Sequence, residues 1–336
     1  MGSEVLDAAS RDDVRTFLSL TDASLRYLTK NVCFVGKAAD LATLAERLES
    51  CHEEEFGMSP LFCPDLIDET CQRGIFPLAI PIGGGHYLYA PKLHIQRSLT
   101  QLLPPVRGFP ISSNEGEGEF TTARLGVSKR YLREQNNVTR AASFDVFINR
   151  MEDLAPVLAL IRAQHGENWL CRALRVCFVN MFANRSRYRT KVIVIAVRRH
   201  RYDARGDAKV ENTTHGALIP TDGAPVDEGD LVAGELGFIV GDTYCSATGA
   251  YSASGAGTLQ LAVTGAAMRS VGCSVWDLGM MMEYKNHFLG CVPLPRKEWI
   301  KFVQDHTRDK SVPENIARLL SERYSSGVPV RELLRA

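Results

Sequence analysis

The sequence lacks a long uninterrupted apolar run, and no stretch approaches the length that spans a membrane. Its first ten residues lack the basic end and apolar stretch of a secretory signal. Leu6 also stands where a myristoylation site requires Ser or Thr. We therefore expect a soluble, cytoplasmic protein that does not associate with a membrane.

Paired cysteines of the CxxC type are missing as well. The nine cysteines are scattered and odd in number, and the eight histidines are equally dispersed. His52 beside Cys51 is the nearest approach to a metal-binding cluster, and no second pair accompanies it. We expect reduced thiols, most of them buried, in a cytosol-like compartment, and neither a metal nor a cofactor.

An excess of charge of either sign is also missing, because 39 Lys and Arg residues balance 39 Asp and Glu residues. A protein that coats nucleic acid carries a basic excess, whereas an enzyme with an RNA substrate need be basic only locally. On an extended segment, one local stripe would place four alternating cations on one face: Arg185, Arg187, Arg189 and Lys191. Such a stripe suits either contact with RNA phosphates or a solvated edge strand whose charges discourage aggregation.

Changes of composition along the chain indicate two parts joined by a loop. Residues 1 to about 60 have amphipathic helical spacing, whereas prolines and glycines impose turns between residues 61 and 98. We interpret residues 111–140 as a linker or surface loop. We therefore expect a smaller amino-terminal domain over residues 1–110 and a main domain over residues 141–336.

The main domain mixes helical and strand patterns. Helical spacing covers residues 153–164, 169–183, 258–271, 296–305 and 313–323. Strand patterns cover residues 192–197, 231–241, 243–251 and 274–283, with Gly241-Asp242 as a hairpin turn. Residues 202–230 are polar and predict a protruding loop. This order of elements is that of an acetyltransferase-like (GNAT-like) mixed-sheet domain, so we expect an α+β fold.

Three sets of residues, in the same order, carry a resemblance to a known family. The first is Gln72–Pro77 (QRGIFP) followed by Leu93–Ser98 (LHIQRS), and the second is Asn168–Arg172 (NWLCR). The third comprises Gly234-Glu235-Leu236, Trp276-Asp277, Leu289-Gly290 and Pro295-Arg296-Lys297. Over about residues 61–300 they resemble the QRGIFP, LHISRS, TWIT-R, GEL, LIDCQ, SLG and PRR strings of the leucyl/phenylalanyl-tRNA–protein transferases.

The resemblance implies an acetyltransferase-like domain packed on a small amino-terminal domain, with the substrate cleft between them. It also implies aminoacyl transfer, of the Leu or Phe type, from aminoacyl-tRNA to the amino-terminal amine of an acceptor protein. In that family, transfer marks proteins for N-end-rule degradation. The amine attacks an activated ester, so the enzyme must orient two substrates, accept a proton and stabilise an oxyanion.

The resemblance also assigns roles by position. Asp277 matches an Asp that would hold the acceptor amine or relay its proton, although an Asp at a strand end also binds backbone amides. Trp169 matches a Trp on which the terminal adenine stacks, and a Trp at a helix start also commonly covers a core. Tyr244 falls at a Phe, in the aminoacyl pocket or in plain core. The remaining substrate-binding positions are Phe76, Ala247 and Gly279.

Departures from the family pattern keep two alternatives open. Gly279 replaces a Gln, Ala247 replaces a Glu, and Leu78 replaces a Trp of the adenine site. One alternative is a catalytically lapsed protein that still binds an aminoacyl group or a peptide. The other is an acyl-CoA-dependent N-acyltransferase, in which the backbone N–H groups of residues 255–257 would cradle a pyrophosphate.

Overall fold

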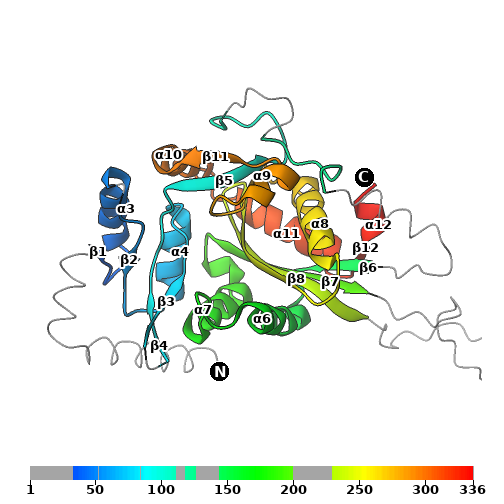
Figure 1. The fold of residues 1–336 in the computed structure, drawn as a ribbon, viewed down its shortest axis with the longest axis horizontal. Helices are drawn as coiled ribbons and strands as arrows, with labels where there is room; N and C mark the ends of the chain where they lie inside the picture. Colours follow the sequence, from blue (N-terminus) through cyan, green and yellow to red (C-terminus); the bar gives the residue numbers. More distant parts are fainter. Residues whose placement is uncertain are drawn as a thin grey trace, which may run out of the picture.

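A computed structural model describes residues 33–51, 53–83, 85–110, 118–125, 144–199 and 229–335. The fold is α+β and centres on one eight-stranded mixed sheet (Figure 1). Its strands are β5 (Gln96–Gln101), β6 (Phe144–Ile148), β7 (Lys191–Arg199), β8 (Asp230–Val240), β9 (Thr243–Tyr251), β10 (Val275–Asp277), β11 (Val292–Pro295) and β12 (Val328–Pro329). Their order is β11-β5-β10-β9-β8-β7-β6-β12. In this sheet β9 and β10 pair in parallel, whereas the other neighbouring pairs are antiparallel.

Helices cover both faces of the sheet because its inner strands are apolar on both sides (Figure 1). In β7, Val192 and Val194 belong to one core, and Ile193 and Ile195 belong to the other, as strand alternation requires. The first core is closed by α6 (Met151–His165), α7 (Arg172–Ala183) and α10 (Arg296–His306). The second is closed by α8 (Ala256–Ser270), α11 (Val312–Tyr324) and α12 (Val330–Leu333). Two short helices, η1 (Arg185–Arg187) and α9 (Glu283–Leu289), complete this part.

The amino-terminal part packs on the first core. It consists of β1 (Cys33–Phe34), α3 (Asp40–Ser50), β2 (Gly57–Met58), α4 (Pro64–Gln72), β3 (Ala79–Gly83) and β4 (His86–Tyr89). The strand β5, which precedes the expected domain boundary at residue 110, lies inside the large sheet between β10 and β11. Leucines of α3 and α4 share the first core with the sheet, so the two parts are continuous.

The expected hairpin is confirmed, since β8 and β9 pair through the Gly241-Asp242 turn. The five expected main-domain helices are confirmed as α6, α7, α8, α10 and α11, and the strand over residues 192–197 as β7. The strand expected over residues 274–283 is wrong in length, because β10 ends at Asp277 and Gly279 has a φ of 76°. Such a backbone leaves the extended region and strongly favours glycine.

Several expectations lie wholly or largely outside the described residues. The helical pattern of the first 60 residues is described only from residue 33, where α3 is present. The expected loop over residues 111–140 is described at 118–125, and the loop over 202–230 only at its last two residues. His52 is outside as well. No described helix combines the length and apolar character needed to cross a membrane.

Candidate functional site

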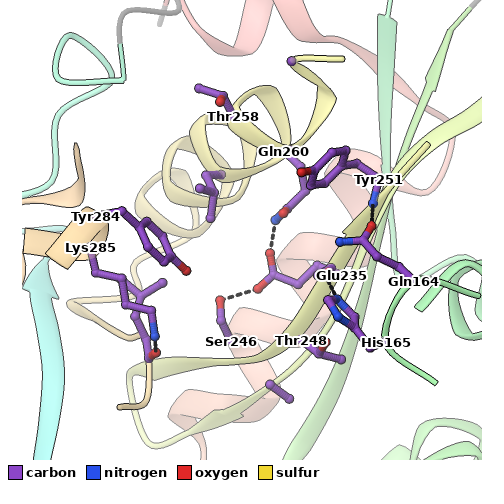
Figure 2. A pocket seen from close by; sticks show the side chains of 16 residues that line it. Gln164, His165, Glu235, Ser246, Thr248, Tyr251, Thr258, Gln260, Tyr284 and Lys285 are labelled. Carbon is purple, nitrogen blue, oxygen red and sulfur yellow. Dashed lines mark hydrogen bonds between the residues drawn. The ribbon is translucent and has the colours of Figure 1, made fainter. Parts of the chain in front are cut away.

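A pocket of about 490 Å³ opens where the parallel strands β9 and β10 part (Figure 2). The two strands pair only from Thr243 to Cys245, after which β10 ends and β9 continues to Tyr251. The far length of β9 forms one side of the pocket, with the amino-terminal turns of α8 above it. Gln164 and His165 of α6 line one end, whereas Tyr284 and Lys285 of α9 line the opposite end (Figure 2).

Glu235 of β8 lies at the floor of this pocket and is 1% exposed. Its Oε1 accepts hydrogen bonds from Tyr244 (2.9 Å) and Ser246, and its Oε2 accepts them from Gln260 and Thr264 (3.0 Å). Figure 2 shows Ser246 and Gln260 reaching the carboxylate from different elements. Burial raises the pKa of Glu235 above its ordinary value, while the four hydrogen bonds oppose that rise.

The charge on Glu235 has no counter-ion among the described residues, because every donor that reaches it is a neutral hydroxyl or amide. An ionised carboxylate has about four lone-pair positions, and four donors occupy them. Buried charges are normally paired, so an unpaired one beside an open pocket is a candidate for chemistry with a ligand.

The rim of the pocket depends on close backbone packing at the start of α8. Gly255 precedes the helix with a φ of 79°, and a Cβ at Gly257 would lie 2.7 Å from the Tyr251 ring. Glycine therefore permits β9 and α8 to approach each other. The first-turn N–H groups of a helix have no intrahelical partner, and here that turn borders the pocket.

Lys285 is the buried cation of the pocket wall. Its Nζ donates to the carbonyl oxygens of Leu278 (2.5 Å) and Met280 (2.8 Å), which holds the chain that follows β10. Burial lowers the pKa of Lys285 below its ordinary value. The ammonium thus fixes the turn after β10 at the edge of the pocket.

A second polar assembly lies between the amino-terminal part and the sheet. Arg97 donates from Nε to Oδ1 of Asp277 (3.1 Å) and from its terminal nitrogen to Oδ2, and both side chains are 2% exposed. The backbone N–H of Gly279 also donates to Oδ1 of Asp277 (2.9 Å). Burial and the neighbouring Arg97 cation lower the pKa of His94 to about 2, so its neutral ring accepts from Arg97 through Nδ1 (2.8 Å).

The residues assigned through the resemblance fall into two groups in space. Phe76 lies 5.4 Å from the half-buried Trp169 between ring centroids, and the Arg97 guanidinium lies over the Phe76 ring at 5.7 Å. Asp277 joins this group through Arg97, and Gly279 joins it through the hydrogen bond of its backbone N–H to Asp277. Ala247 belongs to the pocket wall, whereas Tyr244 is fully buried and reaches the pocket only through Glu235.

The structure places Asp277 differently from the expected amine-binding position. Its oxygens already bind Arg97 and a backbone amide, and it lines a small apolar cavity rather than the open pocket. A carboxylate neutralised in this way is a structural counter-ion. The alternative expectation, an Asp that binds a nearby backbone amide, describes part of its environment.

The expected cationic stripe is wrong in its geometry. Residues 185–187 form the 3₁₀ helix η1 instead of an extended segment, and β7 lies inside the sheet, so it is not an edge strand. The ion pairs of the stripe are Arg187 with Asp65 (2.8 Å), Arg189 with Glu69 (2.6 Å) and Lys191 with Glu314. Arg185 instead lies over the Phe182 ring at 3.9 Å. The four cations therefore do not form one exposed face.

Sequence reasoning assigned no role to Glu235, Ser246, Gln260, Arg97 or Lys285. Two of them carry a usable signal, because Glu235 interrupts an apolar strand and Gln260 interrupts an apolar helix. Buried polar side chains of that kind need partners, and here they are partners of each other. The other three depend on contacts across the fold.

No family model matches the sequence, and no curated protein matches it either.

Proposed function

We propose that this chain transfers an aminoacyl group from aminoacyl-tRNA to the amino-terminal amine of an acceptor protein, in the pocket between β9 and β10. The observation that carries the proposal is Glu235, a buried carboxylate without a described counter-ion at the pocket floor. An acceptor amine enters as an ammonium ion, and such a carboxylate both attracts it and takes up its proton.

The reaction requires little chemical activation by the pocket. The aminoacyl ester is already activated, so holding ester and amine together accounts for much of the rate. Removal of one proton leaves a neutral amine that attacks the ester carbonyl. The first-turn N–H groups of α8 border the same pocket and suit an oxyanion or a phosphate.

Contacts between the strings that resemble the transferase family support this proposal. Arg97 of LHIQRS binds Asp277, which is about 180 residues away in the sequence. Arg296 donates to the Leu93 carbonyl (2.8 Å), and Trp299, close behind it, donates to the Gly74 carbonyl (2.7 Å). Strings that are separated in sequence therefore contact one another in the fold, which supports the proposal.

In this proposal the terminal adenosine stacks on Trp169 and Phe76, which lie outside the set of residues that line the pocket. The two rings meet at a tilt of 50°, and both are half-buried. An aromatic face of this kind binds any base by stacking. Asp277 is then a positioning residue, because it holds Arg97 against the Phe76 ring.

An acyl-CoA-dependent N-acyltransferase is the second candidate. The glycine turn at the start of α8 lines the pocket, and the parallel β9–α8–β10 unit is what an acetyltransferase-like domain would have. Both candidates acylate an amine and differ in the donor. A catalytically lapsed binding protein would keep the pocket without turnover.

The cysteines fit the proposed setting. All nine are free thiols, and seven of them are buried, as the sequence led us to expect. Free thiols persist where the compartment is reducing. In this proposal the activity is cytoplasmic, and the resemblance to the transferase family connects it with N-end-rule protein degradation.

The test supplies tRNA charged separately with labelled Leu, Phe and Met, together with peptides that begin with Arg, Lys or an acidic residue. We expect label in a peptide with a free amine and none in its amino-acetylated control. In parallel, thermal melting is measured with CoA and with an aminoacyl-adenosine analogue, because a bound ligand stabilises the folded state. Protection by CoA alone, without transfer from any charged tRNA, would favour the second candidate.

A further inference from the structure

The donor and the acceptor in each hydrogen bond of Ser246 can be assigned from the chemistry of its partners. The indole Nε1–H of Trp276 lies 2.7 Å from Ser246 Oγ, and an indole nitrogen only donates. Ser246 must therefore accept from Trp276. Because its hydroxyl has one proton, that proton is directed to the other partner, Oε1 of Glu235.

The other side of Glu235 has a determined direction as well. Gln260 Nε2 donates to Oε2 of Glu235 and to Thr264 Oγ1 (2.9 Å). Thr264 accepts from that amide, so its own proton points to Oε2 of Glu235 (3.0 Å). With Tyr244 donating to Oε1, the whole network presents protons to the carboxylate. The arrangement fits an ionised Glu235 that is ready to accept a proton.

Access from the pocket leads to Ser246 rather than to Glu235. Glu235 is 1% exposed, whereas Ser246 is half-buried and lines the pocket. A hydroxyl oxygen has two acceptor positions, and Trp276 occupies one of them. The second position remains for a donor inside the pocket, and the N–H of an ammonium ion is a donor of the right chemistry.

We propose that Ser246 relays a proton from a primary ammonium group in the pocket to Glu235, and that Trp276 sets the direction of this relay. The inference rests on the proposed function, which supplies the ammonium as the acceptor's amino terminus. It adds the amine subsite, its proton acceptor and the connecting hydroxyl. Ser246 is the contact residue, whereas Trp276 is a positioning residue.

The ammonium N–H bond breaks and its proton joins Ser246 Oγ, while the Ser246 proton moves to Oε1 of Glu235. The neutral amine attacks the ester carbonyl, forming the C–N bond, and a second nitrogen proton goes to the ribose oxygen as the C–O bond breaks. The products are the amide and the free hydroxyl of the tRNA. The proton on Glu235 returns to solvent after they leave.

Other titratable groups face the same pocket and belong in any account of its pH dependence. His165 comes from α6, Tyr251 from β9, and Tyr284 and Lys285 from α9. Tyr244 contacts Glu235 from below, and α8 contributes only the neutral Gln260 and Thr264 at Glu235. Burial raises the pKa of Glu235, which brings proton acceptance closer to neutral pH.

The experiment compares Ser246→Thr with Ser246→Val in the full chain. These side chains have nearly the same shape and differ in the hydroxyl, so they disturb packing equally. We expect the Thr variant to transfer within about ten-fold of the wild type and the Val variant to fall at least about 100-fold, the scale of a lost acid–base group. The wild-type and Thr rates should fall as Glu235 protonates at acid pH, and the Val variant should lose that dependence.

Two control variants separate the relay from its surroundings. Thr248→Val removes the next pocket hydroxyl on the same strand and should leave the pH dependence of the rate unchanged. His165→Gln should leave the acid limb of the profile in place. Equal rates and profiles for the Thr and Val variants of Ser246, beside a transferring wild type, would overturn the relay alone. No transfer by the wild type at any pH would overturn the proposed function and the relay together.

Discussion

Replacing Asp277 by Asn removes the counter-ion of Arg97 while leaving the shape of the site almost unchanged. Both side chains of the pair are 2% exposed, and Arg97 directs two nitrogens at the carboxylate. The Asn amide would oppose one of these donors with a donor of its own. Breaking a buried pair on one side costs about 3–5 kcal/mol, because the remaining charge stays buried and unpaired. Because Arg97 keeps its contacts with His94 and with the Phe76 ring, we expect a loss of stability at the lower end of this range, about 3 kcal/mol.

The assay is urea unfolding of the wild type, Asp277→Asn and the double variant Arg97→Met/Asp277→Leu. Total stabilities of about 5–15 kcal/mol make the expected loss easy to measure. The double variant should return to within about 2 kcal/mol of the wild type, because an apolar pair of similar volume needs no counter-ion. An Asp277→Asn variant within about 1 kcal/mol of the wild type would refute the counter-ion role and return Asp277 to direct chemistry.

Three other perturbations test separate parts of the account. Burial acts to lower the pKa of His306, but the hydrogen bond to Asp242 outweighs it, so the pKa is raised overall. The interaction between the His306 cation and Asp242 therefore stabilises the fold fully below the ordinary pKa of 6.5, and this stabilisation is lost as pH rises through the raised pKa. His306→Gln should therefore cost about 1–2 kcal/mol in urea unfolding at pH 6 and less at alkaline pH; a pH-independent difference would contradict this. Trp169→Ala should weaken binding of an aminoacyl-adenosine analogue by about 1–3 kcal/mol in calorimetry, and unchanged affinity would remove the stacking role. Gly241→Ala should destabilise the fold by more than about 1 kcal/mol, since the φ of Gly241 is 59° and an added Cβ would overlap the His306 carbonyl. At Gly272 an added Cβ would meet open space, so Gly272→Ala should lower the stability less. Equal losses of stability in urea unfolding would rule out the overlap.

The sequence patterns predicted those helices and strands that depend on hydrophobic spacing and on turns within a short segment. The β8–β9 hairpin follows from two apolar strands around Gly241-Asp242, and α8 follows from apolar helical spacing after a glycine turn. The early end of β10 was missed because it depends on the positive φ of Gly279 and on Lys285, which binds the carbonyls of the turn. The place of β5 in the large sheet could not be predicted, because this strand inserts between β10 and β11, which are far away in the sequence.

The candidate site was predictable only in part for the same reason. The resemblance selected Phe76, Trp169 and Asp277. The structure places Phe76 and Asp277 against Arg97, and Trp169 packs on Phe76. It did not select the pocket carboxylate, because the hydrogen bonds that define Glu235 come from residues up to 29 positions away. The prediction that the four cations share one face was wrong because alternate residues share a face only where the backbone is extended, and η1 is helical.

The most direct test of the central claim is transfer of labelled Leu or Phe from charged tRNA to a free-amine peptide, with the wild type and Glu235→Gln side by side. Thermal melting and peptide binding confirm that both are folded. The account predicts transfer by the wild type and a loss of at least about 100-fold for Glu235→Gln, because the amide cannot accept the amine proton. A folded Glu235→Gln variant with the wild-type rate would contradict it, as would a wild type that binds both substrates and transfers nothing.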